Sequence, residues 1–367
     1  MIRTLTLTSV LALAPLAHAE LATLVASRDG TLFSDPAGAI ANGSGPVLIV
    51  GRAGGASTAP IRRAVLRFDV AAALPPGSTV NSAQLVLANT SGNTGARTVE
   101  LHRVLQDWGE GASNTTSGQG APAEPGDATW LNTFFPAALW TSPGGDFDSS
   151  VSAQLVLDSF ATYTWPSTAL TVADVQSWLD QPASNFGWLL KLDVETVSNT
   201  TKVLGSREAA LDAERPKLVI DYTPPPVLAY CTSRVSSAGC APAIGWTGLP
   251  SASAGSGFHV TLSQALNQKS GALVYGVSGP AAQPFLGGLL CVAPPLVRTA
   301  PQHSGGNATG IDCSGAFTFD FNARIASGVD PALVTGAVVH VQWFSRDPGN
   351  PAGSFNSSDA LRIAILP

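Results

Sequence analysis

Short runs in which apolar and polar residues alternate dominate the chain, and the clearest of them covers residues 63–69. Its apolar positions share one face and its charged positions share the other: Ala64, Leu66 and Phe68 against Arg63, Arg67 and Asp69. Successive side chains of a β-strand point to opposite faces, so this run predicts a strand with one buried face and one exposed face.

Similar runs recur along the whole chain, separated by clusters of Gly, Pro, Ser and Asn that favour turns. Strands are expected at 82–87, 98–105, 189–194, 217–222, 258–262, 273–277, 317–321, 338–344 and 361–366. One segment, 171–179, has helical spacing instead, with Val172, Val175, Trp178 and Leu179 on one stripe. The sequence therefore predicts an all-β protein of two tandem, jelly-roll-like β-sandwich modules, with one short helix in the first.

The division into modules follows from the proline run at 223–226, which favours an extended spacer because proline cannot donate a backbone hydrogen bond. At the N-terminus, a basic residue, a short apolar stretch and the small residues Ala17 and Ala19 predict a signal peptide cleaved after Ala19. A membrane anchor is the alternative, but the apolar stretch is shorter than the ~20 residues a span requires. The predicted organisation is a signal peptide at 1–19, a first module at 20–222, the spacer, and a second module at 227–367.

Composition agrees with export and limits the partners. Charged residues make up 12% of the chain, about half the usual share of ~25%. The first module carries 12 basic and 20 acidic residues, which argues against a nucleic-acid binder with a broad basic face. No later segment is long and apolar enough to cross a membrane, so a secreted or cell-surface protein is expected.

All four cysteines, Cys231, Cys240, Cys291 and Cys313, belong to the second module. An even number of cysteines in an exported chain predicts two disulfides, for which three pairings exist. Proximity in sequence favours Cys231–Cys240 and Cys291–Cys313. Zinc is the weaker alternative, because no pair has C-x-x-C spacing.

The first module contains an ordered series of motifs that resembles a known family. The series includes RAVLRFDV at 63–70, LPPGSTV at 74–80, DWGE at 107–110, NFGWLL at 185–190 and SRE at 206–208. It resembles the DNRLRE family, which is related to carbohydrate-binding module family 96. The resemblance implies a jelly roll that binds extracellular polysaccharide, often acidic.

The second module is similar to uncharacterised C-terminal modules of secreted bacterial proteins, planctomycete ones especially. The segments PFLGGLLCV at 284–292 and QWFSRDP at 342–348 carry this likeness. It implies a location outside the cell and no particular activity.

No catalytic motif stands out, and the chain is interpreted as non-enzymatic. It lacks the nucleophile elbow, the zinc-protease motif, the phosphate-binding loop and the dinucleotide fingerprint. Glycoside hydrolysis needs two carboxylates paired in space, and Glu100, Asp107, Glu110 and Asp146 are available for that role. Solvated loop acids are the simpler interpretation of these four residues.

Arginines are the strongest candidates for binding a glycan, because a guanidinium group donates paired hydrogen bonds to a carboxylate or sulfate. The expected contacts are Arg52, Arg63, Arg67 and Arg207. The alternative is internal pairing, of Arg67 with Asp69 or Glu208 and of Arg207 with Asp212 or Glu214.

Aromatic rings can stack on sugars, and Trp140 and Trp165 are expected to be exposed because they flank loops rich in Pro, Gly and Ser. A structural Ca²⁺ is the one cofactor considered. Asp146 and Asp148 would hold it together with Asp29 or Asp35, since calcium prefers several oxygen ligands. An ordinary Gly-Gly-Asp turn is the alternative.

These observations predict a secreted, non-catalytic polysaccharide-binding protein, with acidic glycans as the candidate ligands. A structural or adhesive extracellular protein without specific sugar binding is the second hypothesis. A polysaccharide-degrading enzyme is the third.

Overall fold

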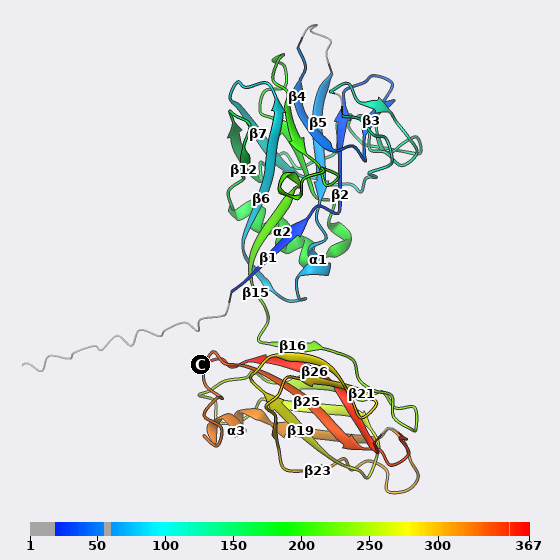
Figure 1. Ribbon diagram of the computed structural model, residues 1–367, viewed down its shortest axis with the longest axis vertical. Coiled ribbons are helices and arrows are strands. Elements are labelled where there is room, and N and C mark those ends of the chain that lie inside the picture. The colour runs from blue at the N-terminus through cyan, green and yellow to red at the C-terminus, as the bar shows by residue number, and fades with distance from the viewer. Residues whose placement is uncertain (1–18, 55–59, 117, 352) are drawn as a thin grey trace, which may run out of the picture. The chain divides into compact units, whose positions relative to one another are not determined.

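The computed structural model describes residues 19–54, 60–116, 118–351 and 353–367 (Figure 1). The predicted signal peptide lies outside the described residues, apart from Ala19. The chain is mostly β, with 43% of its residues in strands and 8% in helices, so the predicted fold class is confirmed. It divides between Pro224 and Pro225, inside the proline run, into two units that are described separately.

The described residues of the first unit form fifteen strands and two α-helices. They are β1 (Glu20–Val25), β2 (Arg28–Phe33), β3 (Ile40–Asn42), β4 (Val47–Arg52), β5 (Ile61–Arg67), α1 (Val70–Ala73), β6 (Thr79–Gly92), β7 (Arg97–Arg103), β8 (Ala121–Pro122), β9 (Asn132–Phe134), β10 (Ala138–Leu139), β11 (Ala153–Leu157), β12 (Thr162–Thr164), α2 (Ala169–Asp180), β13 (Trp188–Leu192), β14 (Lys202–Gly205) and β15 (Lys217–Thr223). The short helix α1 was not expected from the sequence.

Antiparallel pairing runs continuously through nine strands in the order β1-β15-β6-β14-β4-β5-β13-β7-β11. Strands from both ends of this order contribute to one core, including Leu24 of β1 and Leu101 of β7, so the sheet must curl over on itself. Helix α2 closes the core with Trp178, whose ring meets that of Trp188 edge to face at 4.6 Å between centroids. Three residues of the apolar stripe predicted for this helix, Val175, Trp178 and Leu179, are buried, and the fourth, Val172, is partly buried against the core.

Strand β5 is covered on both faces, and this differs from the expected exposed face. Ala64 and Leu66 enter the main core, as the alternation predicts. Val65, on the opposite face, belongs to a second, smaller core. The other buried members of this second core are Leu32, Val104, Trp108, Ala128, Trp140 and Leu189. Four of them come from the excursion between β7 and β11, so this excursion packs over the face where solvent was expected.

The second unit is a sandwich of a six-stranded and a three-stranded sheet, with one further hairpin. Its elements are β16 (Val227–Tyr230), β17 (Ala243–Thr247), β18 (His259–Ala265), β19 (Ser270–Gly276), β20 (Pro280–Phe285), β21 (Gly288–Val292), β22 (Val297–Arg298), β23 (Gln302–His303), β24 (Gly315–Asp320), α3 (Phe321–Ala326), β25 (Val338–Arg346) and β26 (Phe355–Ala364). The large sheet has the order β16-β26-β25-β19-β22, with β23 also on β19, and β17-β18-β24 faces it. Phe317 and Trp343 stack between the two sheets at 5.2 Å between ring centroids.

Both disulfides lie in the second unit, and the pairing favoured by proximity in sequence is wrong. Cys231 is bonded to Cys291 and Cys240 to Cys313. The Cα atoms of the bonded residues are 6.3 and 5.5 Å apart, within the range that a disulfide spans. Folding brings together cysteines 60 and 73 residues apart, so closeness along the chain did not identify the partners.

No helix in the described parts of the chain combines the length and the apolar character needed to cross a bilayer.

Candidate functional site

Arg63, the leading candidate for glycan contact, is held inside the first unit. Its Nε and Nη2 donate to the two carboxylate oxygens of Glu195 at 2.9 and 2.7 Å, and Nη1 donates to the Gly144 carbonyl at 2.8 Å. The guanidinium carbon also lies 4.8 Å from the centre of the Trp130 ring and 5.3 Å from that of Phe147. Only 13% of the Arg63 side chain and 14% of the Glu195 side chain are exposed, so this ion pair is largely shielded from solvent. We call Arg63 and Glu195 the Arg63 clamp.

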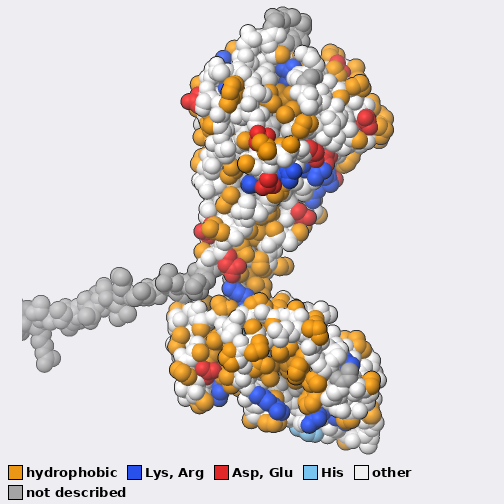
Figure 2. All heavy atoms as spheres, in the orientation of Figure 1, with side chains coloured by type: hydrophobic (Ala, Val, Ile, Leu, Met, Phe, Trp, Pro, Cys, Tyr) orange, Lys and Arg blue, Asp and Glu red, His pale blue; other side chains and the backbone are white. Residues whose placement is uncertain are grey.

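The other expected arginines do not form an open basic face with Arg63. Arg52 and Arg67 are each half-buried, and Arg67 pairs in register with Arg28 of β2. Arg207 donates from Nε and Nη2 to Glu110 at 2.6 and 2.8 Å. The face of the first unit drawn in Figure 2 shows basic side chains beside acidic ones and no separate basic patch. Arg63 and Arg207 therefore do not form the expected exposed platform, because two carboxylates of the same unit, Glu195 and Glu110, pair with their guanidinium groups.

Trp140 and Trp165 are also not the exposed platforms that their neighbouring loops suggested. Trp140 is 5% exposed in the small core, and its Nε1 donates to the Thr129 carbonyl at 2.9 Å. Trp165 is fully buried in the main core and donates to the Val99 carbonyl at 3.2 Å. Both indole N–H groups are satisfied internally, so neither ring is available to stack on a sugar.

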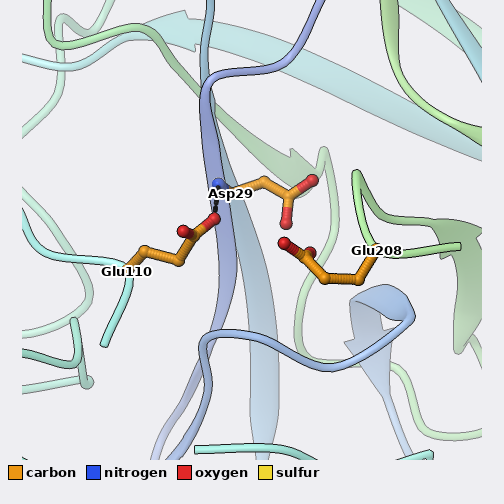
Figure 3. A group of neighbouring side chains, drawn as sticks. All are labelled: Asp29, Glu110 and Glu208. Carbon is orange, nitrogen blue, oxygen red and sulfur yellow. Dashed lines mark hydrogen bonds between the residues drawn. The ribbon is translucent and has the colours of Figure 1, made fainter. Parts of the chain in front are cut away.

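Three carboxyl groups from distant parts of the first unit converge on one point (Figure 3). Asp29 lies on β2, Glu110 follows β7, and Glu208 follows β14, and one oxygen of each lies within 4.8 Å of the others. The carboxyl groups of Asp29 and Glu208 point toward one another, whereas Glu110 accepts the backbone N–H of Asp29 at 2.9 Å. We call these three residues the carboxylate cluster.

Arg207 contacts all three residues of the carboxylate cluster. Its side chain bonds both oxygens of Glu110, its Nε lies 2.8 Å from Glu208 Oε1, and its backbone N–H donates to Asp29 Oδ2 at 2.7 Å. The alternative partners considered for Arg207 in the sequence, Asp212 and Glu214, are therefore wrong. The motifs at 107–110 and 206–208 were visible in the sequence, but their meeting with Asp29 was not, because Asp29 lies 81 residues before Glu110 and 178 residues before Arg207.

The carboxylate cluster has excess negative charge in a buried place. Burial raises the pKa of Asp29 well above its usual value, and the nearby Glu208 and Glu110 raise it further. Burial also raises the pKa of Glu208, against the opposing effect of Arg207. Hydrogen bonding to Glu110 raises the pKa of Arg207, which keeps this guanidinium charged. With all three carboxyl groups ionised, one guanidinium group leaves two negative charges, so the cluster favours additional positive charge, either protons or a metal ion.

The fit of a hard metal ion rests on Asp29. Its side chain is fully buried, and Oδ1 accepts no hydrogen bond from any described residue. A buried oxygen without a hydrogen-bond partner destabilises the fold. Carboxylate oxygens are the ligands that calcium prefers. The carboxylate cluster therefore fits a calcium ion, which would neutralise the excess charge.

Asp146 and Asp148, the other expected calcium ligands, do not join Asp29. Asp146 accepts the backbone N–H groups of Thr141 and Ser142 at 2.7 and 2.9 Å, and Asp148 accepts that of Ser150 at 2.9 Å. Asp35, the alternative to Asp29, accepts the N–H of Ala39 at 2.8 Å. These three aspartates stabilise turns, and the described carboxyl groups close enough together to hold a cation are instead Asp29, Glu110 and Glu208.

An open groove of about 500 Å³ lies beside the Arg63 clamp. It is lined by Leu105, Gln106, Thr141, Ser142, Gly145, Asp146 and Phe147. We call it the first-unit groove. Its lining combines uncharged polar side chains with one aromatic ring, one leucine and one carboxylate, and it shares no residue with the carboxylate cluster.

No family model matches this chain, and no curated protein matches it. Similar solved structures include the crystal structure of a beta-1,2-glucanase from Parabacteroides distasonis, at 8% identity and a TM-score of 0.19. That match covers 96% of this chain and 38% of the glucanase chain. A likeness this distant carries no argument about fold or function.

Proposed function

We propose that this chain is a secreted, non-catalytic protein whose first unit binds an extracellular polysaccharide in the first-unit groove. The single observation that carries this proposal is the groove itself, which is open to solvent and lined by side chains that can donate to and accept from sugar hydroxyls. The resemblance to the DNRLRE family and the two disulfides, which persist in oxidising compartments, support the extracellular part of the proposal.

The groove favours a neutral glycan over an acidic one. The carboxylate of Asp146 lies at its edge, and the nearby Arg63 is neutralised by Glu195. A glycan rich in carboxylate or sulfate would meet no unpaired guanidinium group among the residues that line the groove. Gln106, Thr141 and Ser142 offer uncharged donors and acceptors instead.

A glycan array with the full chain, followed by affinity gel electrophoresis on the polysaccharides that score, tests this proposal. Ser142→Trp fills the groove and is expected to abolish retention on the gel, while Gln106→Ala is expected to weaken it several-fold. Thr162→Trp, an equally large change on the exposed strand β12, is the matched control and should keep full retention. Retention that survives Ser142→Trp would place any sugar site elsewhere.

A structural or adhesive role without specific sugar binding is the second candidate, and the internal ion pairs of Arg63 and Arg207 favour it. Two of the four expected contact arginines are paired bidentately with carboxylates, as in a scaffold that uses its charges internally. An array without any signal, together with a folded and thermally stable chain, would favour this role.

The carboxylate cluster gives little support to the enzyme hypothesis. Glycoside hydrolysis needs one acid that protonates the sugar oxygen and one carboxylate that faces the sugar ring. In the carboxylate cluster Asp29 is fully buried, and Glu110 and Glu208 are both bonded to Arg207. We propose a calcium ion as a structural component of the first unit at this cluster, with the ion joining β2 to the turns that follow β7 and β14.

A further inference from the structure

The large sheet of the second unit has a partly covered outer face that contains a second cavity. On β19 and β25, Leu273 and Trp343 point into the core, so their neighbours Ala272, Val274 and Phe344 lie on the opposite face. The β20–β21 hairpin packs over this outer face. Between the hairpin and the sheet remains a cavity of about 300 Å³, which we call the hairpin pocket.

The hairpin is anchored firmly, so the pocket exists before any ligand binds. Cys291 on β21 is bonded to Cys231, and its backbone N–H donates to Gln342 Oε1 at 2.9 Å. Gln342 Nε2 donates to the Leu289 carbonyl at 3.0 Å. At the hairpin tip, Arg234 donates to the Leu286 carbonyl. A preformed pocket lowers the entropy cost of binding.

The walls of the hairpin pocket are apolar and partly exposed to solvent. Phe285, Leu286 and Leu296 are 44%, 37% and 39% exposed and line the pocket together. Hydrophobic side chains cover much of the drawn face of this unit (Figure 2). Covering such surface releases free energy in proportion to its area, so an apolar ligand is favoured here. The volume is at the lower end of the range for small-ligand sites and is too small for a polymer.

Two arginines of the pocket lining favour a ligand with a negative charge. Arg298 and Arg346 are both exposed, and no carboxylate of the described residues lies within ion-pair distance of either. The guanidinium carbon of Arg346 lies 4.3 Å from the centre of the Phe355 ring, which orients it beside the pocket. An exposed guanidinium group over an apolar wall is complementary to a carboxylate on an apolar body.

We propose that the hairpin pocket binds a small amphipathic carboxylate, an alkyl or aryl chain that fills the apolar part while its carboxylate meets Arg298 and Arg346. This site is independent of the polysaccharide site proposed for the first unit. It gives the second unit a ligand of its own.

Titration calorimetry of the full chain with sodium octanoate tests the proposal. Octanoate is expected to bind saturably, butyrate at least tenfold more weakly because it fills less of the pocket, and octylammonium not measurably because its charge is wrong. The double variant R298Q/R346Q should weaken octanoate binding at least tenfold.

Leu286→Asn tests the apolar wall separately. Leu286 has a φ of 48°, a left-handed conformation that Asn tolerates better than most residues, so the hairpin tip should keep its shape. This variant should also weaken octanoate binding at least tenfold. Lys217→Gln, which removes one positive charge from the first unit, is the control and should leave octanoate binding unchanged.

Amide chemical shifts of Ala272 and Val274 should move on titration with octanoate and remain still with octylammonium. Equal affinity for octanoate and octylammonium, or octanoate binding that survives both R298Q/R346Q and Leu286→Asn, would overturn the proposal. Circular dichroism of each variant, with an unchanged spectrum, shows that lost binding does not come from lost folding.

Discussion

The backbone N–H of Arg207 donates to Oδ2 of Asp29 at 2.7 Å, across 178 residues of chain. This bond satisfies one oxygen of a fully buried carboxyl group and leaves the other without a hydrogen-bond partner among the described residues. The stability of the first unit therefore depends on what neutralises Asp29.

Asp29→Asn separates the two ways of neutralising this group. Burial raises the folded-state pKa of Asp29, so the folded chain keeps a proton that the unfolded chain loses near a pH of about 3.9. The contribution of this proton to folding stability is complete below the unfolded pKa and is lost as the pH rises through the folded-state pKa. At pH 7 with a chelator, Asn should therefore raise the melting temperature by about 2 °C or more. With millimolar calcium, the wild type should gain stability and Asp29→Asn should not.

The control for this experiment is Asp146→Asn, since Asp146 stabilises a turn away from the carboxylate cluster. It should respond to calcium as the wild type does. A wild-type melting temperature that calcium leaves unchanged would mean that a proton, and no metal ion, neutralises Asp29.

Arg63→Ala should destabilise the first unit by about 3 kcal/mol, because it leaves the nearly buried Glu195 carboxylate without its partner. The double variant R63M/E195L should recover most of this loss, since it removes both charges at once. Urea denaturation followed by tryptophan fluorescence measures both variants. Lys217→Ala, which breaks an ion pair with the 72% exposed Asp212, should change stability by less than about 1 kcal/mol.

His340 should make the second unit less stable in weak acid. Burial, with a smaller effect of the Arg362 charge, lowers the pKa of His340 to about 4, whereas the unfolded chain has a value of about 6.5. Between these two values the unfolded chain binds a proton that the folded chain does not. Stability is therefore complete above pH 6.5 and falls by roughly 2 kcal/mol on going to pH 5.

Hydrogen exchange of β25 peptides, corrected for the intrinsic pH dependence of exchange, measures this loss. His340→Gln keeps a donor for the Tyr230 hydroxyl, which lies 3.0 Å from His340 Nδ1, and it should flatten the pH dependence. His303→Gln, on the exposed end of β23, should not. A wild-type protein with equal protection at pH 7.5 and pH 5 would contradict the prediction.

Removing either disulfide should cost the second unit about 4 kcal/mol, because each one closes a loop of 60 residues or more. The two double variants should nevertheless differ in ligand binding. C231S/C291S releases the hairpin over the hairpin pocket and should weaken octanoate binding, whereas C240S/C313S should not. Thermal unfolding and octanoate titration of both variants measure the difference, and equal effects on the titration would contradict it.

The periodicity of the sequence predicted the local elements well. The run 217–222 appears as β15 (Lys217–Thr223), and the helix expected at 171–179 appears as α2 (Ala169–Asp180). Side-chain alternation and the helical stripe are local properties, and the main core forms on the faces they indicate. The fold class could therefore be predicted.

The candidate site could not be predicted in the same way, because its partners meet only through tertiary structure. The alternation at 63–69 placed Arg63 on a polar face, and this was correct for the strand in isolation. It could not indicate that residues following β7 cover that face, nor that Glu195, 132 residues later in sequence, reaches the same guanidinium group. The same reason explains the burial of Trp140 and the wrong cysteine pairing.

Strand β1 pairs with β15 in antiparallel register, with Glu20 opposite Tyr222 and Val25 opposite Lys217. The N-terminal end of β1 and the exit toward the second unit are thus at the same end of this ladder. A pulling force applied between Glu20 and the proline spacer would peel the two strands apart one residue pair at a time, without shearing all six pairs together. In a single-molecule stretching experiment, the first unit should therefore open at low force from this edge, well before its core extends.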